Sequence, residues 1–248
     1  MGCGMLSDTN YFTKVNFDTY LKELAKEFRK LNGKTMKAEI ILVGGAAVLA
    51  NYGFRNMTTD IDAIIHASSA MRDAINKVRD KYDLPQGWLN ADFVRTNSYT
   101  PKLNQYSVYY RTYSNVLTIR TITAEYLIAM KLRSGRKYKN DLSDIIGILN
   151  EHERQGQPIS FEMVEMAVVN LYGGWSGFTE EAQSFIKETI DRGEYDKAFR
   201  ATREEEQKNK IALVKFEKEY PDVLNGDNLQ NIIESLKARR NNNELVDK

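Results

Sequence analysis

One stretch of the chain constrains its fold more than any other: "LVGGAAVLANYGFRNMTTDIDAII", residues 42–65. It joins an apolar run typical of a buried strand to a short helical segment, and then to a second strand. Gly44 and Gly45 separate the first strand from the helix, and Asp60 and Asp62 stand at the start of the second strand. A strand–helix–strand unit with glycines between the first strand and the helix favours an α/β fold.

The periodicity of apolar residues extends this pattern on both sides of the stretch. Apolar side chains at three- and four-residue spacing predict a first helix, with Asn16 as its cap and Asn32-Gly33 at its end. Ser68 is a suitable cap for another helix further on. The predicted elements are a helix over 17–34, a strand over 38–43, a helix over 46–53, a strand over 59–67 and a helix over 69–83.

The pattern changes after residue 83. Residues 84–95 have no clear period and are predicted to be irregular, whereas 105–122 contain two β-rich runs broken at Ser114-Asn115, the signal of a hairpin. Beyond the hairpin the sequence is helical and, after 179, strongly charged; a final helix over 228–240 is followed by a polar tail. The helices are predicted to begin after the caps Thr123, Asn140 and Ser160, and the first of them to stop at Gly135.

These elements predict the fold class and the division of the chain. The chain has 248 residues, with 42% hydrophobic and 28% charged, which is typical of a globular protein with a sizeable core. We predict an α/β (α+β) mixed sheet flanked by helices, followed by an all-helical C-terminal region. The expected domains are 1–150 and 151–248.

Charge and targeting signals exclude several classes of protein. The net charge of +1 gives no overall field for nucleic-acid binding, so any such contact needs a local patch. The single cysteine, Cys3, excludes an internal disulfide framework and suits a reducing compartment. No apolar run has membrane-spanning length, no signal peptide is apparent, and Leu6 spoils the myristoylation motif that begins at Gly2. We therefore expect a cytoplasmic protein without a membrane partner.

The two aspartates are the candidate metal ligands. Side chains two residues apart on a strand point the same way, so Asp60 and Asp62 should project together, with Ile61 on the opposite face. Adjacent carboxylates repel unless a cation lies between them, and Mg²⁺ is commonly held by carboxylates together with substrate phosphates. Gly44 and Gly45 would let the backbone approach such a phosphate at a helix N-terminus. The alternative is a tight turn and two solvated acids.

The order "GG … helix … TTDID" resembles the signature of the polymerase-β-type nucleotidyltransferase superfamily. The resemblance implies that Gly44 and Gly45, with Thr59, bind the triphosphate of an NTP. It also implies that Asp60 and Asp62 hold Mg²⁺ or Mn²⁺ and are catalytic.

A second segment narrows this resemblance. "LIAMKLRSGRKYKNDLSDIIGIL" (127–149) is similar to a helical element of abortive-infection toxin-like nucleotidyltransferases, many of them toxins of bacterial toxin–antitoxin pairs, and "GWLNADF" (87–93) is similar to a segment of uncharacterised bacterial relatives. By this resemblance Lys131 reaches nucleotide phosphates and is catalytic, and Asp141 is catalytic as an auxiliary acid or a positioning group. Asp144 would share the helix face of Asp141.

Both residues also have simpler interpretations. Lys131 could be a snorkelling lysine on an otherwise apolar helix, and Asp141 a first-turn acid that complements the helix dipole. The sequence further departs from the superfamily pattern, because "NVLTIRT" (115–121) lacks the third carboxylate that polymerases carry on a later strand. Asp92 or Asp141 would take that role, or the third acid is absent.

Two functional hypotheses follow. In the first, the protein is an Mg²⁺-dependent enzyme that transfers a nucleotidyl group from an NTP to a hydroxyl of RNA (tRNA) or protein, as the toxin of a pair with an antitoxin protein. In the second, it is a catalytically degenerate nucleotide- or RNA-binding module that acts on a partner through its helical half.

Overall fold

The computed structural model describes residues 11–137, 139–225 and 228–246, so Gly2, Cys3 and Leu6 lie outside the described residues. The chain forms two compact units. The first comprises Met1–Met130 and Glu162–Ser176, and the second comprises Lys131–Phe161 and Gly177–Lys248.

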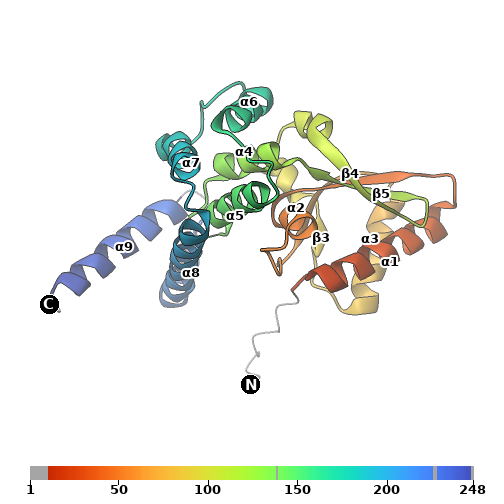
Figure 1. Cartoon of the computed structure of the whole chain (residues 1–248). Helices are drawn as coiled ribbons and strands as arrows, with labels where there is room; N and C mark the ends of the chain where they lie inside the picture. The colour runs from red at the N-terminus through yellow and green to blue at the C-terminus, as the bar shows by residue number, and fades with distance from the viewer. Residues whose placement is uncertain (1–10, 138, 226–227, 247–248) are drawn as a thin grey trace, which may run out of the picture. The chain divides into compact units, whose positions relative to one another are not determined.

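The first unit is built around a mixed sheet (Figure 1). Within the described residues the sheet has five strands in the order β3-β2-β1-β5-β4. The central strand β1 runs antiparallel to β2 and parallel to β5, and the outer pairs are β2 with β3, parallel, and β4 with β5, antiparallel. The predicted mixed sheet is thus confirmed. The strands are β1 (Ala38–Leu42), β2 (Ile61–His66), β3 (Leu89–Asn90), β4 (Ser107–Tyr113) and β5 (Leu117–Ile122).

The predicted hairpin is β4–β5. Ser114 and Asn115 adopt left-handed φ values of 50° and 57°, which suits a tight hairpin turn. After β5 the chain enters α4 (Ala124–Ser134), which ends at Gly135 with φ +58°, as predicted.

The prediction of an irregular segment over 84–95 is wrong in part. This segment contains the strand β3 and the 3-10 helix η1 (Asp92–Arg95). The backbone N–H of Ile61 donates to the Trp88 carbonyl over 2.8 Å, which brings the segment alongside β2. A strand of two residues is too short to show a period-two pattern, so no periodic signal predicts it.

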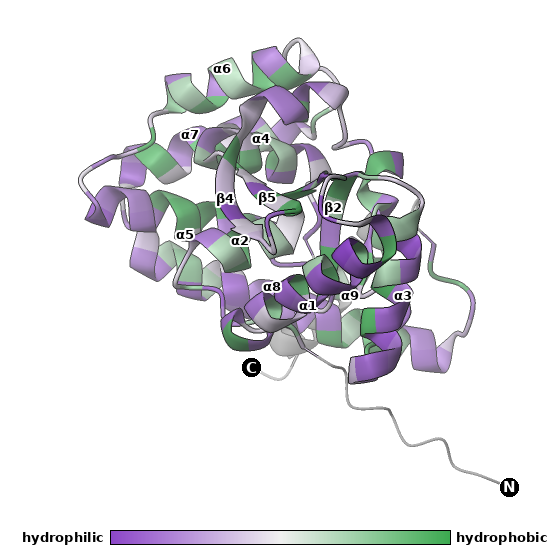
Figure 2. Cartoon of the chain, turned by 90° about the vertical axis from the view of Figure 1, so that its right-hand side faces the viewer, coloured by the Kyte–Doolittle hydropathy of each residue, from purple (hydrophilic) through white to green (hydrophobic). Residues whose placement is uncertain are grey.

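Helices α1 (Lys14–Asn32) and α3 (Ala70–Tyr82) pack side by side in this unit (Figure 1). The colouring of α3 in Figure 2 shows hydrophobic and hydrophilic patches along the helix, as its predicted amphipathic pattern requires. The start of α1 differs from the prediction. Thr13 is the N-cap, and Asn16 lies within the first turn, where its Oδ1 accepts a hydrogen bond from the Thr13 N–H over 2.7 Å.

The second unit is helical in the described residues, which confirms the predicted C-terminal helical region. Helix α5 packs against α8, and α8 in turn contacts α7 and α9. The last helix continues to Val246, so residues 241–246 are helical rather than a polar tail. No helix among the described residues is long and apolar enough to cross a membrane. The helices of this unit are α5 (Asp141–Arg154), α7 (Glu180–Arg192), α8 (Tyr195–Glu219) and α9 (Leu229–Val246), and α6 (Phe161–Tyr172) lies mainly in the first unit.

Candidate functional site

The glycine pair lies where β1 ends and α2 (Gly44–Asn51) begins. The helix therefore starts two residues earlier than predicted, with both glycines in its first turn. The Val43 N–H donates to the Asp62 carbonyl over 3.1 Å, which ties the end of β1 to the second residue of β2. Gly44 has φ +54°, and a Cβ there would lie 3.7 Å from Asp62 Oδ2. The turn and the Asp62 carboxylate are thus close neighbours.

The two aspartates flank a buried isoleucine. Strand β2 begins at Ile61, so Asp60 immediately precedes the strand and Asp62 lies within it. Ile61 is fully buried, whereas Asp60 and Asp62 are half-buried. This alternation agrees with the predicted placement of both acids on one side. The hydroxyl of Thr59, the remaining predicted nucleotide contact in this stretch, donates to Asp60 Oδ1 over 3.3 Å.

Arg55 is a residue that the sequence reasoning missed. A Cβ at Gly45 would lie 2.7 Å from Arg55 Nη2 and 2.8 Å from Thr58 Oγ1. The space beside Gly45 is therefore occupied by a guanidinium and a hydroxyl. The Arg55 Nε–H donates to the Met57 carbonyl over 3.1 Å, and Thr58 is paired with Phe12 through two backbone hydrogen bonds of 2.8 and 2.9 Å. The loop that carries Arg55 is thus fixed against the glycine turn.

One sequence signal points to this residue in retrospect: Arg55 is the only basic side chain in residues 42–65. A guanidinium presents several N–H donors in a planar fork that matches phosphate oxygens. Its position at the turn predicted to bind a triphosphate makes it a candidate phosphate ligand.

Substituting Gly45 by alanine is expected to lower the free energy of unfolding by about 1–3 kcal/mol, as overpacking usually does. Gly45 is not among the glycines with positive φ, so the cost comes from the contacts with Arg55 and Thr58. Alanine has a higher helix propensity than glycine, so this substitution would otherwise stabilise α2. A net loss of stability therefore indicates the contacts with Arg55 and Thr58 as its cause. Urea unfolding of Gly45→Ala, Arg55→Ala and the double variant measures the coupling. A Gly45→Ala protein as stable as the parent would contradict this account.

The donor set at the aspartates fits a hard cation. Carboxylates such as those of Asp60 and Asp62, which flank Ile61, supply the oxygen ligands that Mg²⁺ prefers, and a triphosphate would complete the coordination. Among the described residues no group of three or more His, Cys, Asp or Glu side chains is placed to hold a metal ion. No residue of β5 is acidic, and the carboxylate of Asp92, the first residue of η1, is exposed and lies 3.8 Å from the Arg95 guanidinium.

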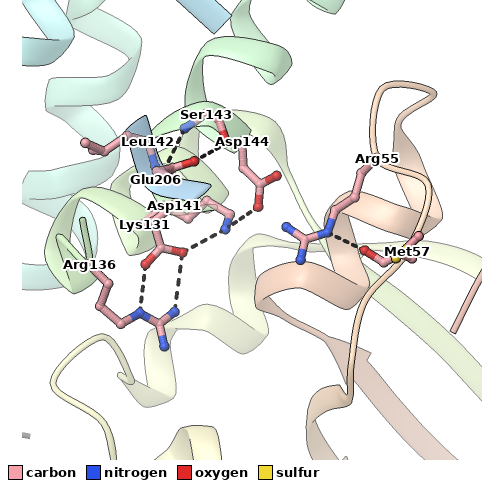
Figure 3. A network of polar contacts seen from close by, with 9 residues as sticks. All are labelled: Arg55, Met57, Lys131, Arg136, Asp141, Leu142, Ser143, Asp144 and Glu206. Atoms are coloured by element: carbon pink, nitrogen blue, oxygen red, sulfur yellow. Dashed lines mark hydrogen bonds and ion pairs between the residues drawn. The ribbon is translucent and has the colours of Figure 1, made fainter. Parts of the chain in front are cut away.

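Lys131 and the two acids of α5 form a buried cluster in the second unit (Figure 3). The Lys131 Nζ lies 3.0 Å from Asp141 Oδ1 and 2.8 Å from Asp144 Oδ2. Lys131 is 4% exposed, Asp141 2% and Asp144 0%. The interpretation of Lys131 as a snorkelling lysine is therefore wrong, because its ammonium is held inside the protein. The expectation that Asp141 and Asp144 share one helix face is confirmed.

Arg136 adds a second cation to Asp141. Its Nε donates to Asp141 Oδ2 over 2.8 Å and its Nη2 to Oδ1 over 3.3 Å. Burial by itself would raise the pKa of Asp141, but the charges and hydrogen bonds of Lys131 and Arg136 outweigh it and hold the pKa well below its ordinary value. Asp141 is thus ionised at neutral pH, as a partner of two cations requires.

The N-terminus of α5 is capped from another helix. Asn140 is the N-cap residue, as predicted, but its side chain makes no capping hydrogen bond. Glu206 of α8 takes this role. Its Oε1 accepts from the backbone N–H groups of Leu142 and Ser143 over 2.9 and 3.2 Å, and its Oε2 accepts from Ser143 Oγ over 2.5 Å (Figure 3). Sequence reasoning missed Glu206 because 63 residues separate it from Ser143.

We expect the stability of the protein to depend on the protonation of Glu206. Burial raises the pKa of Glu206 from 4.5 to about 7, and the hydrogen bonds from Ser143 and Leu142 offset only part of this effect. Between these two pH values the folded chain keeps a proton that the unfolded chain has lost. The free energy of unfolding should therefore rise as the pH falls from 7 towards 4.5, by about 3 kcal/mol from this group.

The isosteric variant Glu206→Gln isolates this contribution. Unfolding of both proteins in urea at pH 5 and pH 8 should show a larger fall in stability with rising pH for the parent than for the variant. Equal pH dependence in the two proteins would rule out titration of Glu206 in this range.

The structure thus brings the predicted residues together in two groups. Gly44, Gly45, Thr59, Asp60 and Asp62 belong to the first unit, and Lys131 and Asp141 to the second.

Comparison with known proteins identifies the family but neither the substrate nor the acceptor. No curated protein and no solved structure matches the chain. A family model described as "Nucleotidyltransferase of unknown function (DUF6036)" matches residues 19–175, a segment that includes the glycine turn, Asp60, Asp62 and the Lys131–Asp141–Asp144 cluster. The chain therefore belongs to this family of nucleotidyltransferases of unknown function.

Proposed function

We propose that the protein transfers a nucleotidyl group from an NTP to a hydroxyl of RNA, with tRNA as the first candidate acceptor. One observation carries this proposal: Asp60 and Asp62 flank a buried residue at the start of β2, and Asp62 lies beside the Gly44–Gly45 turn at the start of α2. Family membership supports the reaction class.

The residues of the first unit would bind and orient the substrate. Backbone N–H groups at the Gly44–Gly45 turn and the Arg55 guanidinium would hold phosphate oxygens, and Thr59 would contribute a hydroxyl. Asp60 and Asp62 would hold Mg²⁺ or Mn²⁺, which supplies charge neutralisation at the phosphates when bound. Such positioning and electrostatic stabilisation provide most of the catalysis in phosphoryl-type transfer.

In the reaction, the acceptor oxygen would bond to the α-phosphorus as the bond between that phosphorus and the bridging oxygen breaks, releasing pyrophosphate. One of the two aspartates would take the proton of the acceptor hydroxyl. By the resemblance of residues 127–149, Lys131 would neutralise charge on the departing pyrophosphate, and Asp141 would act as its auxiliary acid. Asp141 is ionised, so it would serve to hold the lysine rather than to donate a proton.

Purified protein incubated with α-labelled NTPs and total RNA tests the proposal. We expect label to appear in RNA with Mg²⁺ or Mn²⁺ and not with EDTA. Parallel reactions with total protein distinguish the competing acceptor class. Absence of transfer to either acceptor would instead support the alternative, a degenerate nucleotide- or RNA-binding module, which the absence of acidic residues from β5 favours.

The toxin role is a finer proposal and rests on the resemblance alone. In that role the transfer would take place in the cytoplasm, would inhibit growth and would be blocked by a cognate antitoxin protein. Induced expression in a bacterial host should then arrest growth, and Asp62→Ala should abolish the arrest.

A further inference from the structure

Helix α8 lies outside the segment matched by the family model, yet it holds the first turn of α5 by polar contacts. Glu206 is 3% exposed, and its two carboxylate oxygens accept three hydrogen bonds, one from Leu142 and two from Ser143. Asn209, one turn further along α8 and also 3% exposed, donates from Nδ2 to the Lys137 carbonyl over 2.8 Å. One face of α8 therefore holds the chain at Lys137 and again at Leu142 and Ser143.

The same turn of α5 positions Lys131. The first N–H groups of a helix have no partner within the helix, and α5 receives no side-chain bond from its own N-cap. Asp141 precedes Leu142 in the chain, and Asp144 follows Ser143. The carboxylates of Asp141 and Asp144 lie 3.0 and 2.8 Å from the Lys131 ammonium. A shift of this turn would move both partners of the lysine together.

We propose that Glu206 is a positioning residue for Lys131. By capping α5 from α8, it fixes the two aspartates between which the lysine ammonium lies. The C-terminal helical region is then a required support for the Lys131 cluster. The effect on catalysis rests on the proposed function, which assigns Lys131 to the transfer reaction.

Three variants separate this role from a general loss of structure. Glu206→Ala removes all three hydrogen bonds. Glu206→Gln keeps an acceptor oxygen for the Leu142 and Ser143 N–H groups and can donate to Ser143 Oγ, so it should rescue. Glu204→Ala is the matched control, because Glu204 is an exposed carboxylate on the same helix and pairs with Lys208 at 2.8 Å.

Two measurements on the full-length protein provide the test. The first is the ammonium NMR signal of Lys131 in protein labelled with ¹⁵N-lysine, assigned by its loss in Lys131→Arg. The second is the transfer assay, with kcat and KM for the NTP determined separately. We expect Glu206→Ala to shift or broaden the Lys131 signal and to lower kcat about tenfold, the size of effect seen for partners that orient a functional group. The KM of Glu206→Ala should equal that of the parent protein. Glu206→Gln and Glu204→Ala should keep the parent's Lys131 signal, kcat and KM.

The outcomes are distinguishable. An unchanged Lys131 signal in Glu206→Ala overturns the proposal, and so does an altered signal with an unchanged kcat. If the parent protein transfers no nucleotide, the proposed function fails, and the NMR signal alone then decides whether Glu206 positions Lys131. If Glu206→Ala does not fold, Ser143→Ala, which removes one of the three bonds, should change the Lys131 signal in the same direction; no change would again overturn the proposal.

Discussion

Substituting Asp62 by asparagine is expected to lower the rate of Mg²⁺-dependent nucleotidyl transfer about a thousandfold. The amide keeps the size of the side chain but removes the negative charge that would hold the metal ion. Metal-assisted charge stabilisation is worth several kcal/mol, and each 1.4 kcal/mol corresponds to a factor of about ten in rate. Asp60→Asn should have a similar effect, because the proposed metal site uses both carboxylates that flank the buried Ile61.

The matched control is Asp73→Asn, since Asp73 is an exposed aspartate in the first turn of α3 and in the same unit. Its transfer rate should equal that of the parent protein. Urea unfolding of all three variants checks that they are folded. Transfer by a folded Asp62→Asn protein at more than a tenth of the parent rate would mean that Asp62 holds no essential metal ion.

Much of the first unit could be predicted from the sequence because its signals are local. Strand and helix periods fix β1, β2 and α3 to within a few residues, and the left-handed turn at Ser114-Asn115 was readable from residue type. The proximity of the glycine turn to Asp62 also follows locally, since only α2 and a short loop join β1 to β2.

Other features could not be predicted because they depend on contacts between distant residues. Arg55 lies beside Gly45 in a loop after α2 that is paired at Thr58 with Phe12. No local sequence pattern predicts that pairing. Glu206 meets α5 from a helix more than sixty residues away. Its own stretch, "REEEQKNK", is so highly charged that every side chain in it looks solvated in the sequence.

The two glycines illustrate how one motif can have two physical causes. Gly44 is required by its backbone, because φ of +54° is strained for any residue with a Cβ. Gly45 is required by its surroundings, because Arg55 and Thr58 fill the space where a Cβ would be. The sequence reasoning assigned both to phosphate approach. In the structure the space beside Gly45 holds the Arg55 guanidinium, which under the proposed function would bind the phosphate together with the turn.

The second large effect is expected from Lys131→Met, which should lower the free energy of unfolding by about 3–5 kcal/mol. This is the usual cost of removing one member of a buried ion pair, since the remaining charge stays desolvated. The lysine lies within 3.0 Å of both Asp141 and Asp144, and Arg136 gives Asp141 a second cation at 2.8 Å. Asp144 is 0% exposed, so we expect its desolvated carboxylate to contribute to this cost.

A double variant tests this assignment. Lys131→Met combined with Asp144→Asn removes the buried charge together with its ammonium partner, so it should be more stable than Lys131→Met alone. Lys197→Met is the control, because Lys197 is an exposed lysine of the same unit, paired with Glu194 at 3.2 Å, and should cost less than about 1 kcal/mol. Urea unfolding at pH 7 compares all three. If the double variant is no more stable than Lys131→Met, the instability arises from lost packing around the lysine stem, and the buried charge of Asp144 is not its cause.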